Sequence, residues 1–253
     1  MNILVIGETC IDEYVYGVSE RICPEAPVPC FKTNGKKNNT LGMASNVKAN
    51  IEAISNYNVD IITNDVYPVK RRFVDSRYNH IVFREDENDV CCRSDLRTLN
   101  VDDYDAVVIS DYDKGFLSND DIAQIIKISN NERLIFLDTK KKIGNFIDGV
   151  SFLKINSNEL RQNITDLTSV ISYCEEGVII THGGDGCTYH KHPNTHKSYE
   201  ANKVEVTDVC GAGDTFLSAF VVRILQTDEV GESIAYANDC ASKVVKKSGV
   251  CTP

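Results

Sequence analysis

The segment Val206–Phe216, VTDVCGAGDTF, combines residue types that together could transfer a phosphoryl group. Gly211 and Gly213 have no Cβ, so an anion can approach the backbone closely. An apolar run at helical spacing begins at Phe216, and the free N–H groups of a first helical turn attract anions. Asp214 would face that anion, where a carboxylate suits proton removal from an attacking hydroxyl better than phosphate binding. The segment therefore indicates phosphoryl transfer to an alcohol.

The same residues also fit a purely structural interpretation. Gly-Ala-Gly-Asp occurs in ordinary strand-to-helix turns, and Asp214 would then be an acidic residue of a first helical turn. Short glycine motifs often match by chance, so this segment alone leaves both interpretations open.

Composition is that of an acidic globular protein. The chain has 253 residues, of which 42% are hydrophobic and 25% charged, and its net charge is −10. This charge argues against nucleic acid or an anionic membrane surface as the main partner. A phosphorylated substrate would therefore need a local basic pocket.

The cysteines and the N-terminus indicate the compartment. Ten cysteines are scattered without C-x-x-C spacing, so neither a zinc site nor a disulfide framework is expected. The sequence runs from Met1 directly into an apolar strand without a signal-peptide pattern, and no apolar run reaches membrane length. We expect a cytoplasmic protein.

Strands and helices alternate along the chain. This alternation predicts an α/β fold with a doubly wound, mostly parallel sheet, helices on both faces and ligands at the carboxyl ends of the strands. The expected strands are Asn2–Gly7, Val59–Thr63, Ala106–Ser110, Leu134–Asp138, Phe152–Ile155, Val178–Thr181, Cys187–His190 and Val204–Val206. The expected helices are Ala44–Ser55, Ser118–Ser129, one near Glu159, Asp214–Leu225 and Val230–Lys247.

Two further segments have their own patterns. Arg72–Asp75 and His80–Arg84 are typical of a hairpin. The polar stretch Asn34–Thr40 is expected to be a mobile loop.

Five motifs occur in an order that is typical of one family. They are Asp208–Asp214 (D-x-x-G-A-G-D), Arg21–Pro29 (RICPEAPVP), Ser110–Gly115 (SDYDKG), Asn156–Glu159 (N-x-x-E) and Thr181–Gly186 (T-x-G-x-x-G). With them the chain resembles, nearly end to end, the ribokinase/phosphofructokinase-B sugar kinases. The second and third motifs are most similar to the kinase domain of bifunctional ADP-heptose synthesis proteins, which phosphorylates D-glycero-D-manno-heptose 7-phosphate.

The resemblance implies a catalytic and a nucleotide site. Asp214 would be the general base, and the amides of Gly211, Ala212 and Gly213 would stabilise transition-state charge. Asn156 and Glu159 would position Mg²⁺ through waters, and Asp208 would be a site for a monovalent cation, K⁺. The residues expected to bind ATP are Asn156, Glu159, Thr181, Gly183, Gly186 and Asn238.

The resemblance also implies a sugar site under a small β lid. The expected fold is one sugar kinase domain over residues 1–253, with lid strands drawn from about residues 12–33 and 70–86. The lid would cover the sugar and pair two subunits as a homodimer. Substrate-binding residues would be Asp12, Gly42, Asn46, Asp111 and Lys114, with Lys70, Arg72 and Arg77 for a phosphate already on the acceptor.

Several of these residues have structural alternatives. Asn156 and Glu159 could be a helix cap and its first-turn acid, and Lys70–Arg72 could be a solvated strand face. Lys140–Lys142 follows a strand end and could reach a phosphate, although a surface lysine run is the simpler interpretation. His190, His192 and His196 have metal-like spacing but are expected in a polar loop without an acidic or cysteine partner, which disfavours zinc.

The chain departs from the family pattern at three points. Leu41-Gly42 stands where the family has Gly-Gly, so Leu41 would narrow the pocket or stiffen closure. The chain passes from strand Val59–Thr63 almost directly to Lys70, which predicts a sheet trimmed at one edge. The sequence contains no H-x-G-H motif of a nucleotidyltransferase domain. The remaining alternatives are another acceptor, such as an unphosphorylated sugar or a nucleoside, and a catalytically silent sugar-phosphate binding protein.

Overall fold

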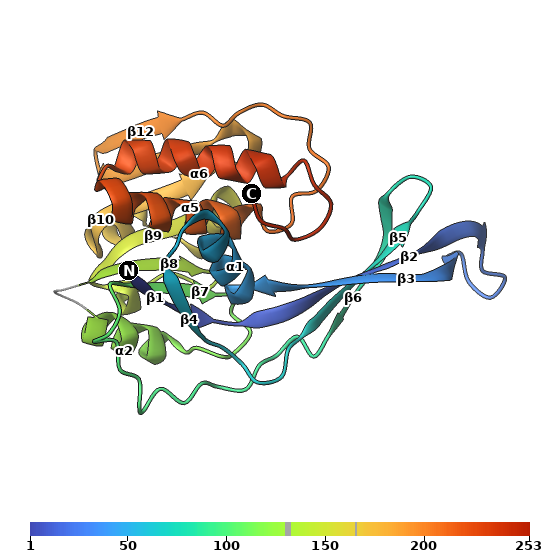
Figure 1. Cartoon of the computed structure of the whole chain (residues 1–253), viewed down its shortest axis with the longest axis horizontal. Helices are drawn as coiled ribbons and strands as arrows, with labels where there is room; N and C mark the ends of the chain where they lie inside the picture. Colours follow the sequence, from blue (N-terminus) through green and yellow to red (C-terminus); the bar gives the residue numbers. More distant parts are fainter. Residues whose placement is uncertain (130–132, 165) are drawn as a thin grey trace.

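The computed structural model describes residues 1–129, 133–164 and 166–253. They form a layered body around an eight-stranded sheet, from which a four-stranded sheet extends to one side (Figure 1). The strands from β10 to β4 are parallel, which confirms the doubly wound, mostly parallel α/β fold. In spatial order the strands are β12 (Thr195–Tyr199), β11 (Cys187–His192), β10 (Cys174–Thr181), β9 (Val150–Asn156), β8 (Leu134–Thr139), β7 (Ala106–Asp111), β1 (Asn2–Gly7) and β4 (Asn58–Ile62).

Helices cover both faces of this sheet because its central strands are apolar on both sides. In β1, Ile3 and Val5 belong to one buried cluster, whereas Leu4 and Ile6 belong to the other. The first cluster includes α1 (Ala44–Ile54), α5 (Ala212–Thr227) and α6 (Val230–Val244), and the second α2 (Asn119–Ser129), α3 (Ser157–Asn163) and α4 (Leu167–Ser172). Within the part of the chain that the structure describes, no helix is long and apolar enough to cross a membrane.

The four-stranded sheet, which we call the lid sheet, has the order β3-β2-β5-β6. Its strands are β2 (Thr9–Ile22), β3 (Pro29–Met43), β5 (Val69–Asp75) and β6 (His80–Glu87). β3 includes Asn34–Thr40, so the prediction of a mobile loop there is wrong. The polar side chains of this stretch are exposed, and its backbone pairs with β2, where Glu13 faces Asn39 and Val15 faces Lys37.

The edges of the main sheet differ from the sequence prediction at one end and agree with it at the other. Val204–Val206 is not a strand. The terminal strand is instead β12, whose polar sequence suits an exposed edge. At the opposite edge the sheet ends at β4, and the chain continues directly to β5 of the lid sheet, as the short segment after Thr63 predicts.

Candidate active site

The N-terminus of α5 has the geometry that an anion site needs. Gly211 precedes the helix with a φ of 76°, in the left-handed region that favours glycine. A Cβ on Gly211 would lie 2.8 Å from Asn46 Nδ2, and a Cβ on Gly213 would lie 3.1 Å from Lys154 Nζ. An ammonium group therefore lies beside the positive end of the helix, and both favour a bound anion.

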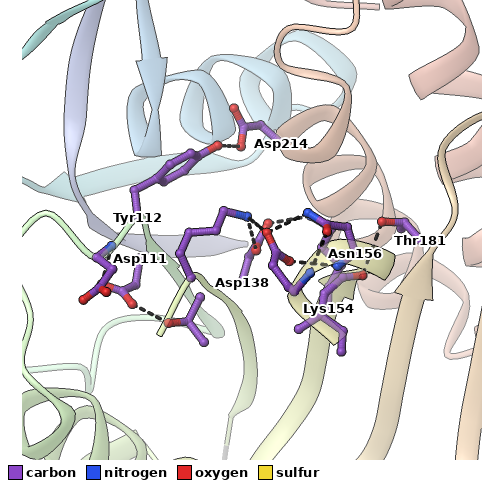
Figure 2. A network of polar contacts seen from close by, with 12 residues as sticks. Asp111, Tyr112, Asp138, Lys154, Asn156, Thr181 and Asp214 are labelled. Carbon is purple, nitrogen blue, oxygen red and sulfur yellow. Dashed lines mark hydrogen bonds and ion pairs between the residues drawn. The ribbon is translucent and has the colours of Figure 1, made fainter. Parts of the chain in front are cut away.

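Asp214, in the first turn of α5, is a buried carboxylate whose two oxygens have separate partners, one of which, Tyr112, is seen in Figure 2. Tyr112 Oη donates to Oδ1 at 2.6 Å, and Asn46 Nδ2 donates to Oδ2 at 2.9 Å. Burial raises the pKa of Asp214, and the two hydrogen bonds oppose that rise. The carboxylate is thus held in one orientation beside the anion site.

A chain of ion pairs runs from Lys154, beside Gly213, to Glu159 in α3 (Figure 2). Lys154 Nζ lies 2.6 Å from Asp138 Oδ2, Lys140 Nζ lies 3.2 Å from Asp138 Oδ1, and Lys140 also pairs with Glu159. Burial alone would raise the pKa of Asp138, but the two ammonium groups outweigh it and lower this pKa. Lys140 and Lys141 are each paired with carboxylates, so the prediction of a surface lysine run is wrong for both.

Asn156 and Glu159 form a capping box at the N-terminus of α3, which confirms their interpretation as a helix cap. The Glu159 carboxylate accepts the Asn156 N–H at 2.8 Å and Asn156 Nδ2 at 2.6 Å. Among residues 1–129, 133–164 and 166–253, no three His, Cys, Asp or Glu side chains gather as a metal cluster. Both Glu159 carboxylate oxygens already accept hydrogen bonds from Asn156, so the structure by itself assigns no metal to this pair.

A cavity of about 420 Å³ lies between the start of α5, α6 and the turn after β10. Its wall includes Thr181, Gly183 and Asn238 from the predicted nucleotide set, and it reaches Ala212 and Gly213 of the anion site. A Cβ on Gly183 would have no heavy atom within 4 Å. The apolar part of the wall consists of Val204, Val206, Val209, Phe216, Ala241 and Val245. An apolar cavity that opens onto an anion site suits a nucleotide, with its base in the first and its phosphates in the second.

Gly186 does not line this cavity, in contrast to Gly183. Its φ is 92°, and a Cβ there would lie 2.0 Å from the carbonyl oxygen of Tyr199. This glycine therefore permits close packing of the turn against the end of β12.

Asp12 and Arg72 form a buried ion pair where the lid sheet meets the body. Arg72 Nη1 lies 2.5 Å from Asp12 Oδ1, and Arg72 Nη2 lies 3.2 Å from Cys210 Sγ in the turn before α5. A Cβ on Gly42 would lie 2.1 Å from Asp12 Oδ2, so glycine is needed to seat this carboxylate. Leu41 is 47% exposed and, as the neighbouring residue in β3, points to the other face of the lid sheet. Leu41 therefore does not narrow the space around Asp12.

Comparison with known families identifies the fold and the chemistry together. The family model described as pfkB family carbohydrate kinase matches residues 52–253, which include the turn before α5 and the nucleotide cavity. The chain belongs to the pfkB family of carbohydrate kinases. It is therefore a sugar kinase.

Curated relatives of this kinase are larger proteins. It is 28% identical to the bifunctional protein HldE of Aliarcobacter butzleri, with 99% of the chain and 62% of the relative covered. It is 27% identical to HldE of Helicobacter pylori strain J99, with 98% and 63% covered. The kinase thus spans about three fifths of these relatives. The first alignment extends over 298 positions against 253 residues in this chain, which agrees with a shortened segment.

Solved structures support the fold. Ribokinase from Thermotoga maritima is 15% identical, with a TM-score of 0.72, and 98% of this chain and 94% of that one are covered. A variant of phosphofructokinase-2 from Escherichia coli is 13% identical, with a TM-score of 0.75 and coverages of 99% and 95%. The ribokinase-like fold expected from the sequence is confirmed.

The three cations expected to read an acceptor phosphate are separated in the kinase. Lys70 Nζ lies 5.2 Å from the centroid of the ring of Tyr112, whose hydroxyl donates to Asp214. Arg72 is ion-paired with Asp12. Arg77 donates from Nε and Nη2 to Asp75, whose partner in β2 is Gly17. Gly17 is five residues along β2 from Asp12, a separation of about 16 Å, so Arg77 does not join the site.

Asp111 is the last residue of β7, and Lys114 lies in the loop that follows it. Asp111 is fully buried and accepts from Thr139 and pairs with Lys141. Burial first, and then the charge of Glu8, raise the pKa of Asp111 to about 6. Lys114 pairs with Asp89 on the chain beyond β6.

Sequence reasoning missed the residues that organise this loop and the centre of the site. Glu8 is fully buried, and its carboxylate accepts the N–H groups of Tyr112, Lys114 and Phe116 at 2.8, 3.0 and 3.3 Å. A carboxylate directly after a buried strand was the available signal for Glu8. Tyr112 lay inside a quoted motif, whereas Lys154 and Asp138 stand in apolar strands without a local signal.

Asp208 connects three parts of the kinase. Its carboxylate accepts the N–H groups of Cys210 and Gly249, both at 2.9 Å, and the hydroxyl of Tyr14 at 3.3 Å. The residue thus ties the turn before α5 to the C-terminal segment and to the lid sheet.

His190, His192 and His196 do not lie in a polar loop, in contrast to the prediction. His190 and His192 belong to β11, and His196 belongs to β12, where it faces His190 with ring centroids 5.3 Å apart. No third ligand joins this pair in the described ranges, so no zinc site is assigned.

Proposed function

We propose that the kinase transfers the γ-phosphoryl group of ATP to the anomeric hydroxyl of a heptose 7-phosphate or a related sugar phosphate. The observation that carries the proposal is the oriented, buried carboxylate of Asp214 at the anion site. That turn borders the nucleotide cavity through Ala212 and Gly213, and the Asp12–Arg72 pair through Cys210. The resemblance of Arg21–Pro29 to heptose-phosphate kinases supports the acceptor.

The proposed reaction follows from this arrangement. The acceptor oxygen forms a bond to the γ-phosphorus, the bond to the β,γ-bridging oxygen breaks, and Asp214 takes the hydroxyl proton. In this reaction the amides of Gly211–Gly213 and the Lys154 ammonium would stabilise the negative charge that develops. Bound Mg²⁺ would neutralise charge on the phosphate oxygens, with Asn156 and Glu159 holding its waters.

An ADP-release screen over heptose phosphates, simple sugars, sugar phosphates and nucleosides tests the function. The highest kcat/KM is expected with a heptose phosphate. Highest turnover on a nucleoside or an unphosphorylated sugar would reassign the acceptor. ADP release no greater with any acceptor than without one would contradict the proposed reaction.

Lys70→Ala is expected to lower kcat/KM about tenfold or more on a phosphorylated acceptor, and much less on the same sugar without its phosphate. A hydrogen bond to a charged group contributes about 1.5–3 kcal/mol, and about 1.4 kcal/mol corresponds to a factor of ten. Lys70 has no ion pair among the residues that the structure describes, so it is available to a phosphate.

The matched control is Lys36→Ala. Lys36, like Lys70, is a lid-sheet lysine that lies over a tyrosine ring, in its case 4.8 Å from the centroid of Tyr16. It should leave both acceptors unaffected. Equal losses on the two acceptors in Lys70→Ala would assign Lys70 to lid support and remove the phosphate-reading role.

We also propose that the lid sheet pairs two subunits. Phe31, Phe73 and Phe83 form an aromatic cluster with centroids 5.4 and 5.7 Å apart, and Phe83 is 59% exposed. Such a surface is costly to leave in water. Phe83→Glu is therefore expected to convert a dimer into a monomer in light scattering, whereas Val90→Glu, at a site 80% exposed, should not. A wild-type protein that is monomeric would contradict the proposal.

Two finer points complete the proposed function. The turn at Asp208 is proposed to bind K⁺, so activity should be higher in K⁺ buffer than in Na⁺ buffer.

All ten cysteines are free, which supports a reducing compartment such as the cytoplasm.

A further inference from the structure

Tyr112 occupies a central position that the proposed reaction does not yet explain. It follows β7 directly, and its hydroxyl donates to Asp214 Oδ1 at 2.6 Å (Figure 2). The ammonium groups of Lys70, from the lid sheet, and Lys140, from the loop after β8, each lie 5.2 Å from the centroid of its ring. Tyr112 therefore contacts the proposed base and two ammonium groups, one from the lid sheet and one from the loop after β8.

The position of this phenol is set by the loop that carries it. Glu8 accepts the N–H groups of Tyr112, Lys114 and Phe116, and Asp111 accepts the N–H of Asp113 at 3.3 Å. The backbone around Tyr112 thus has little freedom. Burial raises the pKa of the Tyr112 phenol well above its ordinary value, so the group stays an O–H donor.

The charges around Asp214 show why a donor matters there. Burial and the charge of Asp138 favour the protonated carboxyl group, whereas Asn46, Tyr112 and Lys154 favour the carboxylate. Cys10 also lies near, but burial raises its thiol pKa to about 12, so it is neutral. The ammonium groups of Lys70 and Lys140 each lie over the Tyr112 ring. Tyr112 is one of only two hydrogen-bond donors from side chains to this carboxylate within the described chain.

We propose that Tyr112 is a positioning residue for the phosphoryl transfer: its hydroxyl holds Oδ1 so that Asp214 meets the acceptor as an oriented carboxylate. The proposal rests on the proposed function, in which Asp214 is the base.

The pH dependence of Tyr112→Phe tests this role. Loss of a donor to the charged form raises the pKa of a carboxyl group, and a base must be ionised to act. The acidic limb of kcat/KM should therefore move to higher pH, by about one pH unit, with a much smaller loss on the alkaline side. Tyr104→Phe is the matched control, because Tyr104 Oη donates to Asp60 Oδ2 at 2.9 Å on the exposed surface. It should leave the profile unchanged.

An equal loss of kcat/KM at every pH in Tyr112→Phe would overturn the proposal, because a residue that only supports the loop would act in that way. An acidic limb that moves to lower pH would overturn it as well.

Unfolding in urea separates this inference from the proposed function, because it needs no acceptor. The folded-state pKa of Asp214 is raised, so its contribution to stability is present at low pH and is lost as the pH rises through that pKa. Tyr112→Phe raises this pKa further, so its reduction of the unfolding midpoint should be larger at pH 8 than at pH 5. In an Asp214→Asn background the difference between the two pH values should vanish. A reduction that is the same at both pH values in both backgrounds would overturn the role of Tyr112, whether or not the kinase turns over the acceptors tested.

Discussion

Asp214→Asn is expected to lower kcat by about two to four orders of magnitude while ATP binding changes little. The amide cannot take the hydroxyl proton, but the nucleotide cavity and the turn at Gly211–Gly213 remain. Steady-state kinetics with the best acceptor, together with titration calorimetry of ATP, separates the two effects. Both Asp214 oxygens accept hydrogen bonds, whereas an amide can accept with only one atom. Thermal unfolding of the variant must therefore accompany the kinetics.

The matched control for this substitution is Asp228→Asn. Asp228 follows the C-terminal end of α5 with a φ of 56°, a value that asparagine adopts readily. The substitution therefore removes one negative charge at the opposite end of the same helix. Its kcat should equal that of the unaltered kinase. Near-normal turnover in Asp214→Asn would exclude Asp214 as the base, and a parallel loss of ATP affinity would assign it to nucleotide binding.

Removal of divalent metal is expected to abolish turnover, and added Mg²⁺ or Mn²⁺ is expected to restore it. The transferred phosphoryl group needs its charge neutralised across several oxygens. Glu159 already accepts from Asn156 and Lys140. Metal should therefore bind weakly to the free kinase and tightly only with ATP, which calorimetry of Mg²⁺ with and without a non-hydrolysable ATP analogue measures.

Glu159→Gln extends this prediction to the protein. Glutamine keeps the capping box but removes the charge, so the Mg²⁺ concentration for half-maximal rate should rise about tenfold. Glu175→Gln, on the exposed part of β10, serves as the control and should change nothing. Turnover that survives chelation, or a strict requirement for zinc, would contradict the metal assignment.

Local sequence patterns were enough to predict much of the fold. The apolar runs of β1 and β7 are buried where the sequence predicts them because strands covered on both faces need no polar side chain. At the start of α2, the side chains of Ser118 and Asp121 each accept the backbone N–H of the other residue. Four consecutive residues are therefore enough to predict where this helix begins. The glycine turn and the capping box at Asn156 are local in the same sense.

Predictions failed where partners, not composition, decide the state of a segment. Asn34–Thr40 is polar enough for a loop, yet β2 pairs with Lys37–Thr40 and again with Thr33, so the segment is part of a strand. Val204–Val206 is apolar enough for a strand, yet it is not paired as one, and Val204 and Val206 line the nucleotide cavity. Lys140 and Lys141 resembled a solvated run because their carboxylate partners stand elsewhere in the sequence.

The sequence by itself determined the family, the alternation of strands and helices and the turn that holds Asp214. Only the tertiary structure brought Tyr112 to Asp214, 102 residues away, and Lys154 to Asp138. It also showed that Arg72 is ion-paired with Asp12, whereas the Lys70 ammonium lies over the Tyr112 ring. The physical reason is that periodicity records which side of an element is buried, whereas contacts between strand ends depend on the order of strands in the sheet. That order is set by the packing of the whole chain.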